Sequence, residues 1–374
     1  MTPRVLDLDH DATTPVDPRV LARFLEVERE APGNPGSVHA LGRRARAALE
    51  EARAELADAL RIPTDAVVFL ASGTEANHLA VRGLGDPRLP LLASAVEHKS
   101  VLAAASERGL REWGLDRCGR AVVRPVEGRV GMLALAQAQG ELGSVQPVAA
   151  AAALARELGV PLHVDAAQSL GRIQHELVLR DADTVAISAH KLGGLRGGSA
   201  LLVLRARPRP LLRGGGQEGG LRAGTASPSL AAATARAVAL AVGELASRAT
   251  AMAAARDAFL AELRALVDCA PLVPPAECLP NTTMLCFDGV DGRALVLALD
   301  LAGVLASQGA ACSSGSPEPP AVLRAMGLGE LESRRCVRFS TAASTTVDDA
   351  REAAQRVARV VLALRAHATR PRAR

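Results

Sequence analysis

The sequence predicts an α/β protein in which helices cover a mainly parallel sheet, followed by a smaller α/β domain. Short apolar runs alternate along the chain with longer Ala- and Leu-rich segments of helical periodicity. The hydrophobic fraction is 49%, but aromatic residues contribute only 2%. A core of Ala, Leu and Val favours helices packed closely on a sheet, and a length of 374 residues indicates two domains.

The individual elements follow from two periodicities. Apolar residues recur at helical spacing over 37–62, 147–159 and 229–266, which predicts helices there. Short apolar runs predict strands at 67–70, 91–92, 161–164, 185–187, 200–204, 283–287, 304–307 and 337–340. Because helices separate many of these strands, we expect a mainly parallel sheet.

Composition argues against several classes of protein. The net charge of +4 comes from mixed signs, without a basic stripe interleaved with aromatics, so no direct nucleic-acid partner is expected. The N-terminus lacks a signal pattern, and no uncharged run approaches the ~18 residues that a membrane span needs. We therefore expect no membrane association and a cytoplasmic location.

The six cysteines include one in an unusual context. None forms a C-x-x-C pair and a chain of this size needs no disulfides, so all six are expected to be thiols. No metal site is predicted, because no H-E-x-x-H motif is present. Cys312 lies in a Gly/Ser/Ala stretch at 307–316, a context that favours an exposed, reactive thiol. The others are expected to be structural: Cys118, Cys269, Cys278, Cys286 and Cys336.

Two strand ends carry the candidate catalytic pair. Lys191 follows the strand at 185–187, where burial would lower its pKa and leave an amine able to form a Schiff base with a carbonyl. Taken alone, Lys191 is better explained as a surface lysine after an edge strand. Asp165 ends the strand at 161–164, and Gln168 follows three residues later. Pyridoxal phosphate needs both a lysine and an acid, and ligands bind beyond such strand ends. The pair therefore suggests this cofactor.

Other junctions carry polar residues with two explanations each. Ser72 to Thr74 lies where a strand feeds a helix, which favours either phosphate binding or a simple helix cap. His98 either caps its helix or lies over an aromatic ligand, although taken alone it is better explained as a core histidine. The G-x-G-x-x-G within 214–220 lacks a flanking strand–helix unit, which argues against a dinucleotide site. It is either a flexible loop or one that places Arg222 and Thr225 near an anion.

The ordered set of motifs resembles cysteine desulfurases of the NifS/IscS type, within the class V aminotransferase group of pyridoxal-phosphate enzymes. Each motif is weak alone, whereas their order over nearly the whole chain is specific. The resemblance rests on residues 9–15, 33–35, 72–77, 97–99, 163–169, 188–191, 214–218, 222–225, 309–316, 318–319 and 337–340.

This resemblance implies a fold type I pyridoxal-phosphate-dependent transferase that forms a homodimer. Its large, cofactor-binding domain would span 15–250, with a mainly parallel sheet of the seven-stranded type. A smaller α/β domain would combine 1–14 with 251–374 and carry the reactive cysteine. The implied reaction removes sulfur from L-cysteine, giving L-alanine and a persulfide on Cys312. A sulfur-acceptor protein would receive that sulfur, as in iron–sulfur cluster assembly.

The resemblance also assigns roles to individual residues. Lys191 would form the Schiff base, Asp165 would pair with the ring nitrogen, and Thr225 would reach in from the partner subunit. The implied catalytic residues are Lys191, Cys312 and His98. The implied cofactor-binding residues are Gly73, Thr74, His98, Asp165, Gln168, Ser188, His190, Lys191 and Thr225. The implied substrate-binding residues are Arg338 and Asn34.

The chain also departs from the family pattern. Residues 127–141 are fewer than in relatives, which predicts that a helix and a strand are truncated or missing. Gly140 stands where an asparagine contacts cofactor and substrate, Asp11 where asparagine or serine is common, and Gly219 where arginine is common. Two alternatives stay open: a weakened or repurposed cofactor-binding relative that binds a partner, and another class V enzyme such as selenocysteine lyase. Cys312 argues against plain transamination.

Overall fold

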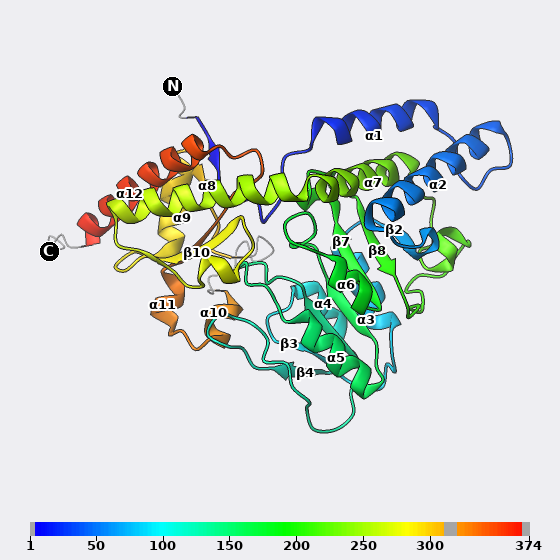
Figure 1. The fold of residues 1–374 in the computed structure, drawn as a ribbon, viewed down its shortest axis with the longest axis horizontal. Helices are drawn as coiled ribbons and strands as arrows, with labels where there is room; N and C mark the ends of the chain where they lie inside the picture. Colours follow the sequence, from blue (N-terminus) through cyan, green and yellow to red (C-terminus); the bar gives the residue numbers. More distant parts are fainter. Residues whose placement is uncertain (1–3, 310–319, 369–374) are drawn as a thin grey trace, which may run out of the picture.

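The computed structural model describes residues 4–309 and 320–368 and is built around a seven-stranded sheet (Figure 1). Its strand order is β2-β8-β7-β6-β5-β3-β4. β8 runs antiparallel to both neighbours, and the other pairs are parallel. The predicted mainly parallel sheet is therefore confirmed. The strands are β2 Val67–Leu70, β3 Leu91–Ser94, β4 Leu110–Trp113, β5 Met132–Ala136, β6 Leu162–Asp165, β7 Thr184–Ser188 and β8 Ser199–Val203.

Both faces of this sheet are covered by helices, which explains why its strands are apolar at nearly every position. Successive side chains point to opposite faces: Val67 and Phe69 pack in one cluster, Val68 and Leu70 in another. The first cluster includes α2, α5 and α7, and the second includes α3 and α4. The helices are α1 Pro18–Glu30, α2 Ala40–Leu60, α3 Gly73–Gly83, α4 Lys99–Ala105, α5 Val148–Leu158, α6 Glu176–Asp181, α7 Pro228–Gly243, α8 Leu245–Leu266, α9 Gly292–Leu301, α10 Ala321–Ala325, α11 Glu330–Arg334 and α12 Val347–Ala368.

The remaining strands form two small sheets beside α8, α9 and α12. β10 (Thr282–Cys286) pairs antiparallel with β12 (Cys336–Ser340) and β9 (Ala270–Pro271). β1 (Leu6–Asp7) pairs with β11 (Val304–Leu305), so the start of the chain lies among C-terminal elements. The expected division at residue 250 falls inside α8, and the division into two domains stays a prediction.

The predicted helix over 229–266 is divided at Glu244 into α7 and α8. The two axes differ by 74°. In the ranges described, no single helix has the length and apolar character needed to cross a membrane, and α7 with α8 passes that test only as this bent pair.

Of the two alternatives for the strand between residues 127 and 141, truncated or missing, the structure rules out the second. β5 lies there, in the interior of the seven-stranded sheet, and pairs with β3 and β6. Its apolar run is buried on both faces, so removing it would open the core. Residues 114–131, which connect β4 to β5, contain no helix.

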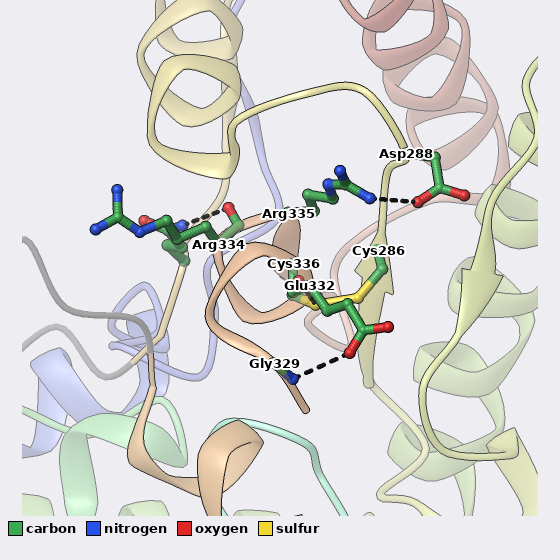
Figure 2. Close-up of a disulfide and its surroundings, with 8 residues drawn as sticks. Cys286, Asp288, Gly329, Glu332, Arg334, Arg335 and Cys336 are labelled. Carbon is green, nitrogen blue, oxygen red and sulfur yellow. Dashed lines mark hydrogen bonds and ion pairs between the residues drawn. A yellow bond between two sulfur atoms is a disulfide. The ribbon is translucent and has the colours of Figure 1, made fainter. Parts of the chain in front are cut away.

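The expectation that every cysteine is a thiol was also wrong. Cys286 and Cys336 form a disulfide (Figure 2). The antiparallel register of β10 and β12 places the two residues directly opposite each other, with their Cα atoms 4.1 Å apart. Their separation of 50 residues in sequence hid this pairing. Within the described part of the chain, the free thiols are Cys118, Cys269 and Cys278.

Candidate active site

The carboxyl ends of β6 and β7 carry the predicted lysine and aspartate. Asp165 is the last residue of β6, and a short 3₁₀ helix, η2 (Ala189–Lys191), follows β7 directly. The parallel register pairs Asp165 with Ala186, so both strand ends lie at one edge of the sheet. The structure thus brings Asp165, Ser188, His190 and Lys191 together. Ligands of open α/β sheets bind at such an edge.

The environment of Lys191 favours a reactive amine. Burial lowers its pKa to about 8, although the nearby Asp165 carboxylate acts in the opposite direction. Charges of Arg172 and Arg338 add to the lowering. A larger fraction of the side chain is therefore neutral near pH 7 than for an ordinary lysine, and only the neutral amine attacks a carbonyl.

The N-terminal motif fixes the turn that carries Lys191. The Thr14 hydroxyl donates to the carbonyl of His190 (2.9 Å) and accepts the backbone N–H of Gly193 (2.9 Å). Thr13 Oγ1 lies 3.1 Å from His190 Nδ1, and burial lowers the pKa of that imidazole to about 4. His190 is therefore neutral at physiological pH, and its predicted contact with a phosphate would be a hydrogen bond.

Asp165 is held by two donors. Asn77 Nδ2 donates to Oδ2 (2.7 Å), and the backbone N–H of Ala167 donates to Oδ1 (2.9 Å). These contacts fix the plane of the carboxylate, as a partner for a protonated ring nitrogen requires. Sequence analysis missed Asn77. Its signal was an amide on the buried face of α3, between the apolar Ala76 and Leu79, because buried amides need partners.

The N-terminus of α3 faces the end of β7. A Cβ atom added to Gly73 would lie 3.7 Å from Ser188 Oγ. Ser72 caps the helix, since its hydroxyl accepts the N–H of Glu75 (3.1 Å), and the Thr74 side chain is exposed. Free N–H groups of a first helical turn beside a hydroxyl suit an anion such as phosphate. Gly73, Thr74 and Ser188 therefore fit the predicted phosphate site.

His98 occupies the N-cap of α4. Its Nδ1 accepts the backbone N–H of Ser100 (3.2 Å) and lies 2.6 Å from Ser100 Oγ. Burial lowers the pKa of the imidazole, and the charge of Asp165 opposes this lowering. The capping explanation is therefore correct, while the predicted position over the cofactor ring stays a prediction.

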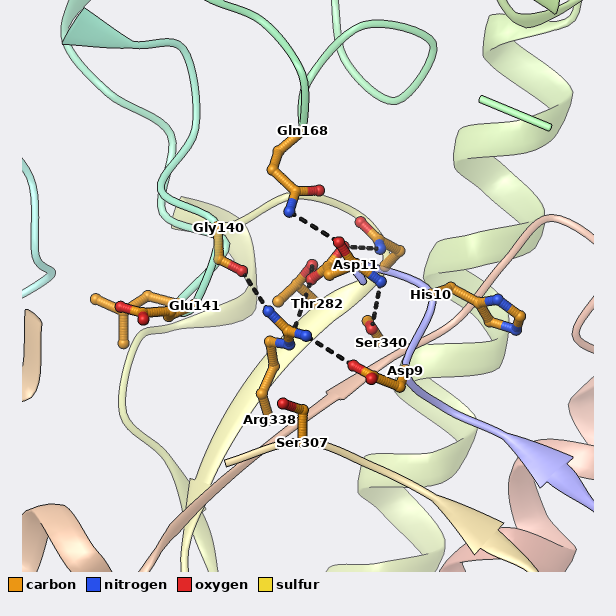
Figure 3. A network of polar contacts seen from close by, with 12 residues as sticks. Asp9, His10, Asp11, Gly140, Glu141, Gln168, Thr282, Ser307, Arg338 and Ser340 are labelled. Atoms are coloured by element: carbon orange, nitrogen blue, oxygen red, sulfur yellow. Dashed lines mark hydrogen bonds and ion pairs between the residues drawn. The ribbon is translucent and has the colours of Figure 1, made fainter. Parts of the chain in front are cut away.

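Arg338 lies on β12 with its guanidinium group buried (Figure 3). Nη1 donates to the carbonyl of Gly140 (2.8 Å), and Nη2 pairs with Asp9 Oδ1 (2.7 Å). Its Nε has no hydrogen-bond partner among residues 4–309 and 320–368. Nε lies 4.0 Å from Asp11 Oδ2, so a substrate carboxylate that needs two parallel hydrogen bonds from this guanidinium would compete with Asp9.

Asp11, where the resemblance predicts a neutral residue, is compensated by opposite charges and hydrogen bonds. Burial raises its pKa, but the arginines Arg172 and Arg338 outweigh that effect and the net pKa is lowered. Asn281 Nδ2 (2.9 Å) and Thr282 Oγ1 (2.7 Å) also donate to the carboxylate. Arg172 was missed from the sequence because its partner lies 161 residues away.

Gln168 and Gly140 meet beside this cluster. Gln168 Nε2 donates to the carbonyl of Asp11 (3.1 Å), and its Oε1 accepts from Arg172 (3.1 Å). A Cβ atom added to Gly140 would lie 3.2 Å from Gln168 Nε2. Gln139 does not replace the absent asparagine, because its Oε1 is used by the N–H groups of Glu141 and Leu142 (both 2.7 Å).

Two predicted residues do not join this group within the described chain, and a third lies outside it. Asn34 and Thr225 line one cavity with Arg53 and Glu218, whereas Lys191 lines another. Asn34 Oδ1 accepts the N–H of Gly36 (2.8 Å). Cys312 lies outside the described residues.

The residues on either side of the Cys312 segment lie close together. A Cβ atom added to Gly309 would lie 2.8 Å from Pro320 Cγ and 3.6 Å from Glu141 Oε1. Ser307 pairs through its backbone with Arg338. Ser307 therefore lies beside the strand that carries Arg338, and Gly309 lies beside Pro320 and Glu141.

Comparisons with known proteins point to one family. The model of the aminotransferase class-V family matches residues 7–352. A cysteine desulfurase of Bradyrhizobium diazoefficiens is 34% identical over 373 residues, covering 96% of this chain and 95% of that protein. The solved structure of a NifS-like protein has a TM-score of 0.87 at 26% identity, covering 96% and 99%. That of SspA in complex with cysteine has a TM-score of 0.77 at 28% identity, covering 91% and 99%.

Proposed function

Since the chain belongs to the class-V aminotransferase family, we propose that it is a pyridoxal-phosphate-dependent cysteine desulfurase. The observation that carries this proposal is the pair formed by Lys191 and Asp165 at adjacent strand ends, beside the anion-binding N-terminus of α3. These residues match the three parts of the cofactor: its aldehyde, its ring nitrogen and its phosphate.

Each group of the chain has a defined task. When bound, the cofactor supplies an electron sink for the bond that breaks next to the substrate nitrogen. Lys191 Nζ would hold the cofactor aldehyde, and its free amine could carry a proton at this position. Asp165, held by Asn77 and Ala167, keeps the ring nitrogen protonated. Gly73, Thr74, Ser188 and His190 bind the phosphate.

The substrate contacts follow from Arg338 and Cys312. Arg338 binds the carboxylate of L-cysteine in competition with Asp9, because a planar guanidinium matches both oxygens. The Cys312 thiolate attacks the substrate sulfur, whose bond to carbon breaks. The sulfur stays on Cys312 as a persulfide, and the carbon takes up a proton to give L-alanine. The roles of Cys312 and Arg338 remain predictions.

The biological setting belongs to the same proposal. The enzyme acts as a homodimer in the cytoplasm, with Thr225 and Asn34 contributing to the partner's site, and delivers sulfur to an acceptor protein. Thr225 and Lys191 line different cavities within one chain, which supports the contribution across the dimer.

The test measures L-alanine and sulfide together after incubation with L-cysteine and a dithiol reductant. We expect equal amounts from a yellow protein. Lys191→Ala should remove the visible absorption band and both products, and Cys312→Ala should keep the band but lose sulfide. Cys269→Ala is the matched control and should behave as wild type. It removes a buried free thiol that packs in the cluster formed by α8, α9 and α12. A keto acid without sulfide would contradict the proposal.

A further inference from the structure

Asn77 joins the two groups that we assign to the cofactor ring. Its Oδ1 lies 2.9 Å from His163 Nε2, and its Nδ2 lies 2.7 Å from Asp165 Oδ2 and 2.9 Å from Ser100 Oγ. All four side chains are buried, with exposed fractions of 1% for Asn77 and 0% for His163. Buried polar groups need hydrogen-bond partners, and the contacts above supply them from within this group.

Donor and acceptor roles in the group allow one arrangement. Only Nδ2 can donate to the Asp165 carboxylate, so Oδ1 must face His163 and accept from its Nε2–H. Burial lowers the pKa of His163 to about 4, so that ring is neutral and its Nδ1 accepts from the Thr184 hydroxyl (2.9 Å). Ser100 Oγ accepts the second Nδ2 hydrogen, which leaves its own hydrogen to donate.

The free hydrogen of Ser100 points to His98. Ser100 Oγ lies 2.6 Å from His98 Nδ1, and the backbone N–H of Ser100 donates to the same atom. A backbone N–H can only donate, so Nδ1 carries no proton. The neutral His98 ring therefore carries its proton on Nε2.

We propose that Asn77 is a positioning residue that orients the Asp165 carboxylate and, through the Ser100 hydroxyl, holds His98 in the Nε2–H form. A single carboxamide thereby couples the group assigned to the ring nitrogen with the group assigned to the ring face. What the two groups act on rests on the proposed function, whereas the hydrogen-bond pattern does not depend on it.

This arrangement constrains how His98 handles a proton. Uptake at Nδ1 would lose two hydrogen bonds, so the ring begins the reaction as a donor at Nε2. The charges that act on His98 come from Asp165, Lys191, Glu141 and Lys99, and burial has a larger effect on its pKa than any of them. In this form, His98 acts as a neutral hydrogen-bond donor at Nε2.

The first experiment is ¹⁵N NMR of histidine-labelled protein without cofactor. In wild type, Nε2 of His98 should resonate as a protonated nitrogen and Nδ1 as an unprotonated one. Asn77→Ala should leave Nδ1 unprotonated, because the backbone N–H of Ser100 still donates to it, but should raise the pKa of His98 by about half a unit to one unit, the effect of weakening one hydrogen bond to the neutral ring. Ser100→Ala should do the same, and it provides a second variant if Asn77→Ala fails to fold.

A second readout separates the two branches. In the cofactor-loaded protein, Asn77→Ala should shift the pH midpoint of the visible band, whereas Ser100→Ala, which keeps the contact with Asp165, should not. His78→Gln, on the same helix outside the network, is the control and should change neither readout. A proton on His98 Nδ1 in wild type, or unchanged His98 signals in both variants, would overturn the inference. The expected NMR pattern in a protein that releases no sulfide would instead count against the proposed function.

Discussion

At Arg338, two neighbours already occupy part of the guanidinium that we assign to the substrate. Asp9 and the carbonyl of Gly140 each take one terminal nitrogen (Figure 3). Burial raises the pKa of Asp9, which shows that the desolvation of this carboxylate is only partly offset by Arg338. Asp9 is therefore a competitor for the carboxylate of L-cysteine as well as a support for Arg338.

Asp9→Asn should lower KM for L-cysteine by roughly fivefold, with a smaller change in kcat. The amide still contacts Arg338 but no longer neutralises it, and a difference of ~1 kcal/mol corresponds to about fivefold in binding. Steady-state kinetics measure both constants. Asp288→Asn, which removes an aspartate paired with Arg335 on the surface, is the control and should leave KM unchanged. A raised KM would show that Asp9 acts only as a support.

The residue scale also shows which site residues a sequence can reveal. Lys191 and Asp165 were found because each ends an apolar run, a pattern that is local. Asn77 and Arg172 were missed because their partners lie 88 and 161 residues away. Only the fold brings such pairs together.

Among the elements, β12 links the disulfide to the site. Cys336 begins this strand and Arg338 follows two residues later, so the bond to Cys286 ties the strand of Arg338 to β10 (Figure 2). Flanking contacts extend the link, since Arg335 pairs with Asp288 across the same strands (3.1 Å). The disulfide thus stabilises the pairing of β10 with β12, the strand that carries Arg338.

Replacing both cysteines, as Cys286→Ala with Cys336→Ala, should lower the free energy of unfolding by about 2–4 kcal/mol, because the closed loop constrains the unfolded chain. Denaturant titration measures this change. A reductant should destabilise the wild type by a similar amount and leave the double variant unaffected. Equal sensitivity of both proteins to the reductant would contradict a stabilising role. Cys269→Ala is the matched single-thiol control.

For the whole molecule, Thr225 and Lys191 line different cavities of one chain, so a site that contains both would need two chains. Glu218 lies earlier in the same loop segment as Thr225. It is buried, forms a bidentate pair with Arg53 (both contacts 2.9 Å) and accepts the N–H of Phe69 (2.8 Å). The segment that carries Thr225 is thus anchored on the side of the molecule where Asn34 also lies. The proposed dimer would bring this side to the partner's site.

Mixing two defective proteins tests that arrangement. Lys191→Ala and Thr225→Ala homodimers should each bind the cofactor poorly, for lack of the lysine or of a phosphate contact. A mixed dimer contains one site with both changes and one with neither. Refolding the two variants together should therefore restore up to about half of the wild-type absorption per mixed dimer, with sedimentation reporting the dimer. No recovery in a verified mixed dimer would contradict the contribution across the interface. Lys99→Ala mixed with Lys191→Ala serves as the reference.

The sequence by itself determined the class of fold, the mainly parallel sheet, and the strand ends that carry Lys191 and Asp165. These features depend on hydrophobic periodicity and on residues close together in the chain, which the sequence displays directly. Tertiary structure alone decided that β5 is retained, that Cys286 meets Cys336, and that Asn77 contacts both Asp165 and Ser100. Each of these depends on strand register or helix packing between distant segments. Such contacts form, and stabilise the protein, only when the chain has folded.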